Sequence, residues 1–226
     1  MKQTIISRFL AVALMMTTGN LAANAGWTDN LSPYDLNAPL GWATVDGNVT
    51  GGEGGTKVTV TNKTELMNAL KGTDKKIIYV DGEIEFSGLT NVKSVQNKTI
   101  IGMKGAAFVN SKHSASVSET GIMQLSSCKN IILRNIIFKS AGAYDIDGND
   151  NLTIIGSTYI WVDHCDFQDG VDGNFDCVNG SDNICVTWCR FRYLIAPWAG
   201  GSGGSNDHRN CDLWGNSDKR SGDEGH

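Results

Sequence analysis

Apolar and polar positions follow two different patterns along this chain, and the change comes near Lys98. Before that point, short alternating stretches predict β-strands at Lys57–Thr61, Lys76–Val80 and Glu83–Phe86. The last two predicted strands lie on either side of Asp81-Gly82, a dipeptide typical of turns.

One helix is predicted among these strands. Residues Lys63–Leu70 place apolar side chains at helical spacing, and Gly72 follows the expected end. Thr61, Asn62 or Thr64 is available as the N-cap.

After Lys98 the chain becomes a series of short apolar runs broken by Gly, Asn, Ser and Asp, with no further helix of useful length. Three of these runs align with one another: Asn130–Phe138, Tyr159–Phe167 and Asn183–Phe191, with their final Phe residues 29 and 24 positions apart. A weaker copy follows at Asn210–Leu213. Repeats of this period with little helix predict a solenoid of stacked coils. The predicted fold is therefore all-β, a right-handed parallel β-helix.

The same alignment explains the cysteines. Cys165, Cys189 and Cys211 occupy equivalent places in their repeats, and equivalent residues of successive coils stack about 4.8 Å apart. This arrangement predicts a ladder of buried free thiols. Two alternatives stay open: at least one disulfide, and a zinc site formed by His164, Cys165 and Cys177.

The first 25 residues have the features of a signal peptide. Lys2 and Arg8 give a positive start, Phe9–Met16 is an apolar run too short to span a membrane, and Ala23-Asn-Ala25 resembles a cleavage site. We expect a secreted or periplasmic, monomeric protein whose residues 26–226 form part of one domain. The formal charge of −5 becomes more negative without the leader, which argues against nucleic acid as a partner.

Acidic residues dominate the middle of the repeats. No Lys or Arg lies between Lys139 and Arg190, whereas nine aspartates do: Asp145, Asp147, Asp150, Asp163, Asp166, Asp169, Asp172, Asp176 and Asp182. A solvated acidic turn region is one interpretation, but the alternation of these residues with Ile, Val, Phe and Trp indicates folded strands. Carboxylates without basic neighbours in sequence predict a site for a hard cation, and Ca²⁺ prefers such oxygen ligands.

Three of the aspartates are the best candidates for that site. Asp172 and Asp176 flank Gly173, and Asp150 lies one coil earlier. On a β-helix these residues are expected to converge where a strand meets a turn. Asp163 and His164 are expected to hold a turn through hydrogen bonds rather than to act in chemistry.

Several motifs resemble those of the pectate lyase superfamily of extracellular polysaccharide lyases. They are Trp161-Val-Asp-His164, Asp172-Gly-x-x-Asp176 and Val186-Thr-Trp188, and the resemblance runs from about Gly41 to the end of the chain. It also includes Gly51–Gly55, Lys98–Gly102, Asn130–Asn135 and Ala199–Arg209. The resemblance implies a right-handed parallel β-helix that cleaves polygalacturonate by β-elimination with Ca²⁺.

By position, the resemblance places the family's calcium carboxylates on Asp150, Asp172 and Asp176, with Asp172 where many relatives have Glu. The pectin lyase branch, which acts on methyl esters, generally lacks this cluster, so the cluster implies an unesterified, acidic substrate.

The family's catalytic base is an arginine in an Arg-x-Pro motif, and none of the six arginines of this sequence lies in such a motif. The place of a substrate-binding lysine of the family reads Ile195-Ala-Pro197, with Trp198 nearby. We therefore predict no catalytic residue in this chain and expect it to be the N-terminal part of a longer lyase, inactive and poorly soluble alone.

Two alternative functions stay open. A polygalacturonase-type hydrolase on a similar β-helix would use a carboxylate pair as acid and base. A non-catalytic β-helix would bind acidic polysaccharide.

Overall fold

The computed structural model describes residues 39, 41–142, 146 and 148–195. The predicted signal peptide, Cys211 and the weak repeat copy at Asn210–Leu213 lie outside these residues.

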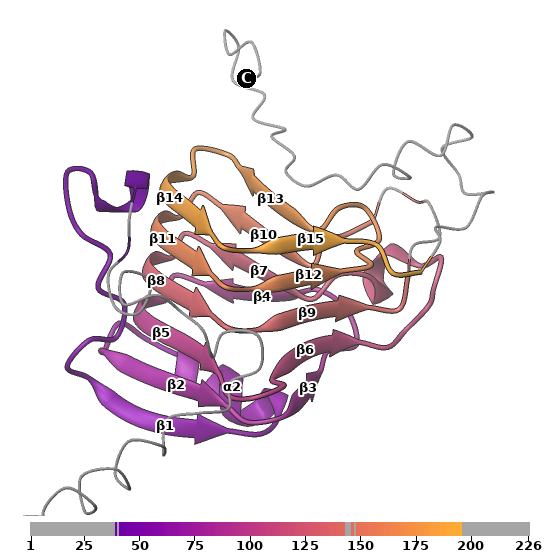
Figure 1. The fold of residues 1–226 in the computed structure, drawn as a ribbon, viewed down its shortest axis with the longest axis horizontal. Coiled ribbons are helices and arrows are strands. Elements are labelled where there is room, and N and C mark those ends of the chain that lie inside the picture. The colour runs from indigo at the N-terminus through magenta and orange to yellow at the C-terminus, as the bar shows by residue number, and fades with distance from the viewer. Residues whose placement is uncertain (1–38, 40, 143–145, 147, 196–226) are drawn as a thin grey trace, which may run out of the picture.

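The described strands form three sheets that run along one elongated body, and all of their pairings are parallel (Figure 1). The six-stranded sheet contains β1 (Thr56–Val60), β2 (Lys76–Val80), β5 (Gln96–Gly102), β8 (Lys129–Arg134), β11 (Thr158–Asp163) and β14 (Asp182–Thr187). The four-stranded sheet contains β4 (Thr90–Lys93), β7 (Met123–Ser126), β10 (Leu152–Ile155) and β13 (Phe175–Val178). The five-stranded sheet contains β3 (Glu83–Glu85), β6 (Ala107–Asn110), β9 (Ile137–Ser140), β12 (Asp166–Gln168) and β15 (Arg190–Arg192).

The chain visits the sheets in a fixed cycle. From β4 onward it passes from the four-stranded to the six-stranded and then to the five-stranded sheet, and the next coil stacks on the one before. This path is a parallel β-helix, as predicted. The strands predicted before Lys98 are also present, with β1 beginning and ending one residue earlier than expected and β3 ending at Glu85.

Register in the sheets agrees with the repeat alignment. Phe138, Phe167 and Phe191 are paired in successive strands, and their rings stack with centroids 4.8 and 5.0 Å apart. Phe108 and Phe86 extend this aromatic column into the earlier coils. The column runs through the core from Phe86 to Phe191, so the repeat of a terminal Phe in the sequence is a repeat of core packing.

Two of the described cysteines, Cys128 and Cys165, are buried in the interior, and the other three, Cys177, Cys185 and Cys189, are partly buried. Cys165 is fully buried, and its backbone N–H donates to Cys189 Sγ at 3.4 Å. The five cysteines in the described part of the chain are free thiols, as the ladder prediction required.

Helix α2 (Lys63–Leu70) closes the end of the solenoid nearest the N-terminus (Figure 1). Asn62 is its N-cap and accepts a hydrogen bond from the backbone of Glu65, while the Glu65 side chain accepts one from the backbone of Thr61. This arrangement resembles a capping box, except that Glu65 accepts from the residue before the N-cap and not from the N-cap itself. Leu66 and Leu70 are buried against the core, so the helix shields the apolar interior that an open solenoid end would expose.

Two short 3₁₀ helices, η2 (Gly41–Thr44) and η3 (Val117–Glu119), complete the described elements. No helix within the described residues is long and apolar enough to cross a membrane.

Candidate functional site

The three predicted calcium ligands lie on two adjacent coils. Asp150 comes just before β10, Asp172 lies in the connection from β12 to β13, and Asp176 belongs to β13. Strands β10 and β13 pair in parallel, and the Leu152 N–H, two residues after Asp150, donates to the Asn174 carbonyl of the next coil. The structure therefore brings residues 22 and 26 positions apart into neighbouring segments at one end of the four-stranded sheet.

Asp150 is held on both of its carboxylate oxygens. Oδ1 accepts a hydrogen bond from the Gly173 N–H at 2.9 Å, and Oδ2 accepts one from Thr153 Oγ1 at 2.8 Å. Burial raises the pKa of Asp150 to about 6, the hydrogen bond from Thr153 opposes that rise, and the negative charge of Asp172 adds to it. Asp150 and Asp172 are therefore close enough to repel each other, which is the electrostatic condition that a bound cation relieves.

Asp176 faces outward from β13. Its neighbour Phe175 is buried in the core, and Asp176 is paired with Thr153 of the previous coil. Because side chains alternate between the two faces of a strand, Asp176 and Thr153 share the outer face. Thr153 thus links the two coils, since it contacts Asp150 through its hydroxyl and lies beside Asp176 in the sheet.

A buried amide network fixes the turn that carries Asp172. Asn174 Oδ1 accepts hydrogen bonds from Asn151 Nδ2 at 2.8 Å and from the Gly170 N–H at 3.2 Å. Asn151 also donates to the Gln168 carbonyl and accepts from Ser140 Oγ, and both asparagines are fully buried. A side chain at Gly170 would collide with the Gly173 carbonyl, so the turn requires glycine there.

Asn151 and Asn174 position the acidic site but were not identified from the sequence. Asn151 directly follows Asp150, and Asn174 lies between Asp172 and Asp176, so an asparagine beside each acidic position is the signal that was available.

The donor set suits Ca²⁺ in chemistry. Three carboxylates supply oxygen ligands, and Asp172 and Asp176 are only partly buried, so they remain open toward solvent. Within the described part of the chain, no three His, Cys, Asp or Glu side chains are already gathered closely enough to form a metal cluster. The three carboxylates therefore match Ca²⁺ in ligand type but are not gathered into a closed metal site.

The interpretation that the nine aspartates lack basic neighbours is wrong for two of them. Asp163 is 1% exposed and accepts hydrogen bonds from Arg134 Nε at 2.8 Å and Thr187 Oγ1 at 2.6 Å. Arg134, Asp163 and Thr187 occupy the same position in β8, β11 and β14. Asp166 pairs with Arg190, which occupies its position in the next coil, and with Arg192, two residues further along β15. Stacking of coils brings these arginines close, although they are distant in sequence.

Two further aspartates have structural hydrogen bonds. Asp169 accepts hydrogen bonds from the backbone of Leu194 and Ile195, and Asp182 accepts one from the Trp42 indole. The expectation that Asp163 serves the structure agrees with its contacts, and His164 Nδ1 lies 2.8 Å from Asp163 Oδ2. Asp145 and Asp147 lie outside the described residues.

Known proteins share this sequence pattern. A family model described as pectate lyase matches residues 13–191. The chain is 32% identical over 195 residues to a pectate trisaccharide-lyase of Thermotoga maritima, covering 80% of this chain and 46% of that protein. It is also 32% identical over 178 residues to pectate lyase plyB of Emericella nidulans, covering 75% of this chain and 49% of that protein. The chain thus spans about half the length of the curated relatives it matches.

Solved structures share the fold. A pectate lyase of Bacillus subtilis superposes with a TM-score of 0.52 at 22% identity, covering 67% of this chain and 59% of that one. A pectate lyase bound to a hexasaccharide gives a TM-score of 0.52 at 24% identity, covering 66% and 57%. These similarities confirm the prediction of a right-handed parallel β-helix.

Proposed function

Because the chain belongs to the pectate lyase family, we propose that it contributes to calcium-dependent β-elimination of polygalacturonate, with Asp150, Asp172 and Asp176 as the calcium ligands. The observation that carries this proposal is the pKa of Asp150, which burial and the neighbouring charge of Asp172 on the adjacent coil both raise, with Asp176 on the strand paired with β10. A buried carboxylate beside a second carboxylate favours a divalent cation, because the cation offsets both the burial and the repulsion.

Each ligand has a distinct part in the proposed site. Asp150 is oriented by the Gly173 backbone and by Thr153, so its carboxylate is fixed before any ligand arrives. Asp172 and Asp176 are partly exposed and complete the protein side of the site. A calcium ion bound there would act as a Lewis acid that neutralises the uronate carboxylate next to the proton to be removed.

The substrate follows from the same charges. A calcium ion held by three carboxylates keeps coordination positions open, because Ca²⁺ takes about six to eight oxygen ligands. An anionic uronate oxygen fills such a position better than an ester oxygen, so a polymer with free uronate groups is favoured over its methyl ester. We assign no catalytic base to a residue of this chain, because none of its arginines lies in an Arg-x-Pro motif. We also propose that the protein is a monomer and that it acts outside the cytoplasm, in the periplasm or the medium.

Calcium-dependent binding of polygalacturonate tests the proposal. The wild-type chain should be retained more strongly on immobilised polygalacturonate in calcium than in EDTA, whereas Asp176→Asn should show the same, weaker retention in both conditions. Asp182→Asn is the matched control, because Asp182 is bonded to Trp42 and belongs to the same acidic run. Retention that is indifferent to EDTA and to Asp176→Asn would contradict the assignment. Under elimination, any product formed carries an unsaturated uronate, and a saturated product would instead favour hydrolysis.

A further inference from the structure

One position of the repeat departs from its equivalents in the other coils. Asn97, Asn130, Tyr159 and Asn183 occupy equivalent places near the starts of β5, β8, β11 and β14. All four have left-handed backbone conformations, with φ values of 55°, 60°, 57° and 53°. Asparagine tolerates this conformation because its short side chain bonds locally, whereas tyrosine adopts it at a steric cost. A strained tyrosine where asparagine fits indicates that the ring itself is used.

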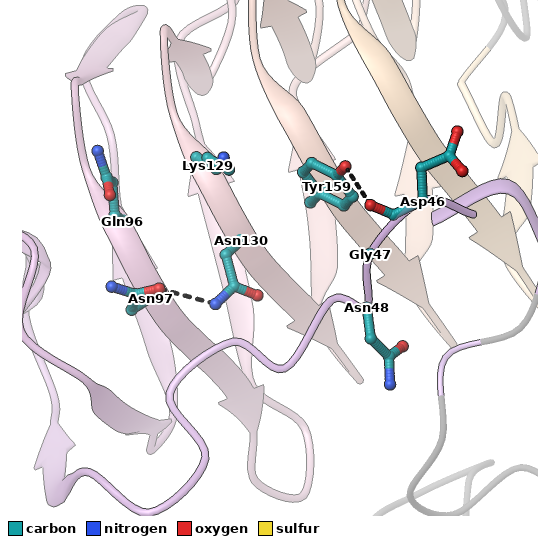
Figure 2. Close-up of a pocket in the computed structure, with 8 residues that line it drawn as sticks. All are labelled: Asp46, Gly47, Asn48, Gln96, Asn97, Lys129, Asn130 and Tyr159. Atoms are coloured by element: carbon teal, nitrogen blue, oxygen red, sulfur yellow. Dashed lines mark hydrogen bonds between the residues drawn. The ribbon is translucent and has the colours of Figure 1, made fainter. Parts of the chain in front are cut away.

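Tyr159 forms one wall of a surface pocket. Its hydroxyl donates to the Asp46 carbonyl at 3.2 Å, and a Cβ at Gly47 would lie only 2.7 Å from the ring (Figure 2). The segment 46–48 therefore rests closely on the ring. A pocket of about 350 Å³ opens between this segment and the six-stranded sheet, lined by Asp46, Gly47, Asn48, Gln96, Asn97, Lys129, Asn130 and Tyr159. That volume is within the range of small-molecule sites.

The floor of the pocket is rigid. Asn130 accepts hydrogen bonds from the backbone N–H groups of Thr50 and Gly51, both at 2.7 Å, and donates to Asn97 Oδ1 at 2.7 Å (Figure 2). Asn97 in turn donates to the Thr73 carbonyl. These two amides are therefore occupied by the fold and support the pocket rather than bind in it.

Other polar groups of the pocket have free hydrogen-bonding capacity. Lys129 Nζ lies 5.4 Å from the centre of the Tyr159 ring and forms no ion pair with any described residue. The side-chain amides of Gln96 and Asn48 make no hydrogen bond within the described part of the chain. An ammonium group, two amides and an aromatic ring are the groups that bind the carboxylate, the hydroxyls and the apolar face of an acidic sugar.

This pocket is distinct from the acidic site. Asp150 lies before β10, and Tyr159 lies beyond that strand and the turn that follows it. A four-residue strand spans about 13 Å, so one monosaccharide cannot contact both places.

We propose that this pocket is a second saccharide-binding site, which takes one hexuronate unit of an acidic polysaccharide. Lys129 pairs with the uronate carboxylate, Gln96 and Asn48 bond to hydroxyl groups, and the Tyr159 ring packs against the sugar. The choice of a uronate rests on the proposed function, while the pocket and its chemistry stand without it. Binding here needs no calcium, because none of the three predicted calcium ligands lines the pocket. The site would keep the protein on its polymer while the acidic site engages another segment.

Titration calorimetry with trigalacturonate in EDTA tests this inference, with circular dichroism to confirm the fold of each variant. The full chain should bind in EDTA, and Tyr159→Asn and Lys129→Gln should each weaken binding about tenfold. Tyr159→Asn is a mild change, since asparagine occupies the equivalent position in three other coils. Lys129→Arg and Tyr159→Phe should bind nearly as well as wild type, because they keep the charge and the ring. The methyl ester of trigalacturonate should bind about tenfold more weakly than the free acid.

The possible outcomes separate this inference from the proposed function. No binding in EDTA, or equal binding by wild type, Tyr159→Asn and Lys129→Gln, would overturn the second site whatever calcium does. Loss of binding in Tyr159→Phe would also overturn it, because the tyrosine would then act only by holding segment 46–48 through its hydroxyl. If wild type binds in EDTA, Tyr159→Asn and Lys129→Gln weaken that binding, and calcium adds nothing to the affinity of wild type, the second site stands and the calcium proposal fails.

Discussion

Two groups of aspartates from one acidic run have opposite surroundings in this fold. Asp163 and Asp166 are each 1% exposed and are paired with arginines of neighbouring coils. Asp150, Asp172 and Asp176 lie at the end of the four-stranded sheet, where the nearest charge that acts on Asp150 is another carboxylate. Both groups look alike in sequence. The difference shows that a carboxylate is structural or available for a ligand according to what the adjacent coil places beside it.

Removing a paired carboxylate should have the largest effect on stability. Asp163→Ala leaves Arg134 without its partner and removes the acceptor for the Thr187 hydroxyl. Breaking a buried ion pair by deleting one partner typically costs about 3–5 kcal/mol in the free energy of unfolding. Urea unfolding followed by circular dichroism measures the loss.

The matched control for that experiment is Asp172→Ala, a change of the same kind in a partly exposed residue of the same run. Asp172→Ala should lower the free energy of unfolding far less than Asp163→Ala does. Similar losses in the two variants would mean that pairing with Arg134 does not distinguish the two groups.

Unpaired Asp150 should make the ion-free protein less stable as the pH rises. Its folded-state pKa of about 6 exceeds the ordinary value of 3.8, so the folded state holds the proton more tightly than the unfolded state does between those values. The contribution of Asp150 to the free energy of unfolding is therefore largest below about pH 4 and is lost as the pH rises through about 6. The shift corresponds to roughly 3 kcal/mol at most.

Thermal unfolding in EDTA between pH 4.5 and 7.5 tests this sign. Asp150→Asn keeps an oxygen to accept from the Gly173 N–H and should remove most of the decline. Added calcium should also reduce the decline in wild type. A wild-type protein that becomes more stable over this interval to the same extent as the variant would contradict the assigned pKa.

The smallest effect is expected at an exposed ion pair. Lys112 and Glu119 are 2.6 Å apart, but their side chains are 42% and 39% exposed, and solvent screens such pairs. Lys112→Ala should leave the urea midpoint unchanged within error at both low and high salt. A clear decrease in the urea midpoint at low salt would show that an ion pair stabilises this fold without burial, and burial would then not be needed to explain the stability loss in Asp163→Ala.

Much of the fold was predictable from the sequence, because each sequence repeat places the same kind of side chain at the same core position of a coil. The alignment of Phe138, Phe167 and Phe191 and the equivalence of Cys165 with Cys189 both follow from one residue per coil at a fixed core position. The helix at Lys63–Leu70 was also predicted correctly, and the structure selects Asn62 from the three possible caps.

The electrostatics were less predictable, for a physical reason. Arg134 lies 29 positions before Asp163, and Arg190 lies 24 positions after Asp166, so a count of charges along the chain misses both pairs. Such pairs depend on register between coils. The supporting amides Asn151 and Asn174 were missed because a buried hydrogen-bond network has no period in the sequence.

Calcium affinity of the acidic site tests the central claim most directly. Titration calorimetry of the full chain with CaCl₂, with and without trigalacturonate, should show one calcium-binding event that trigalacturonate strengthens. Asp176→Asn should weaken it at least about tenfold, and Asp166→Asn, corrected for any unfolded fraction, should leave it unchanged. Equal calcium affinity in wild type and Asp176→Asn would contradict the account.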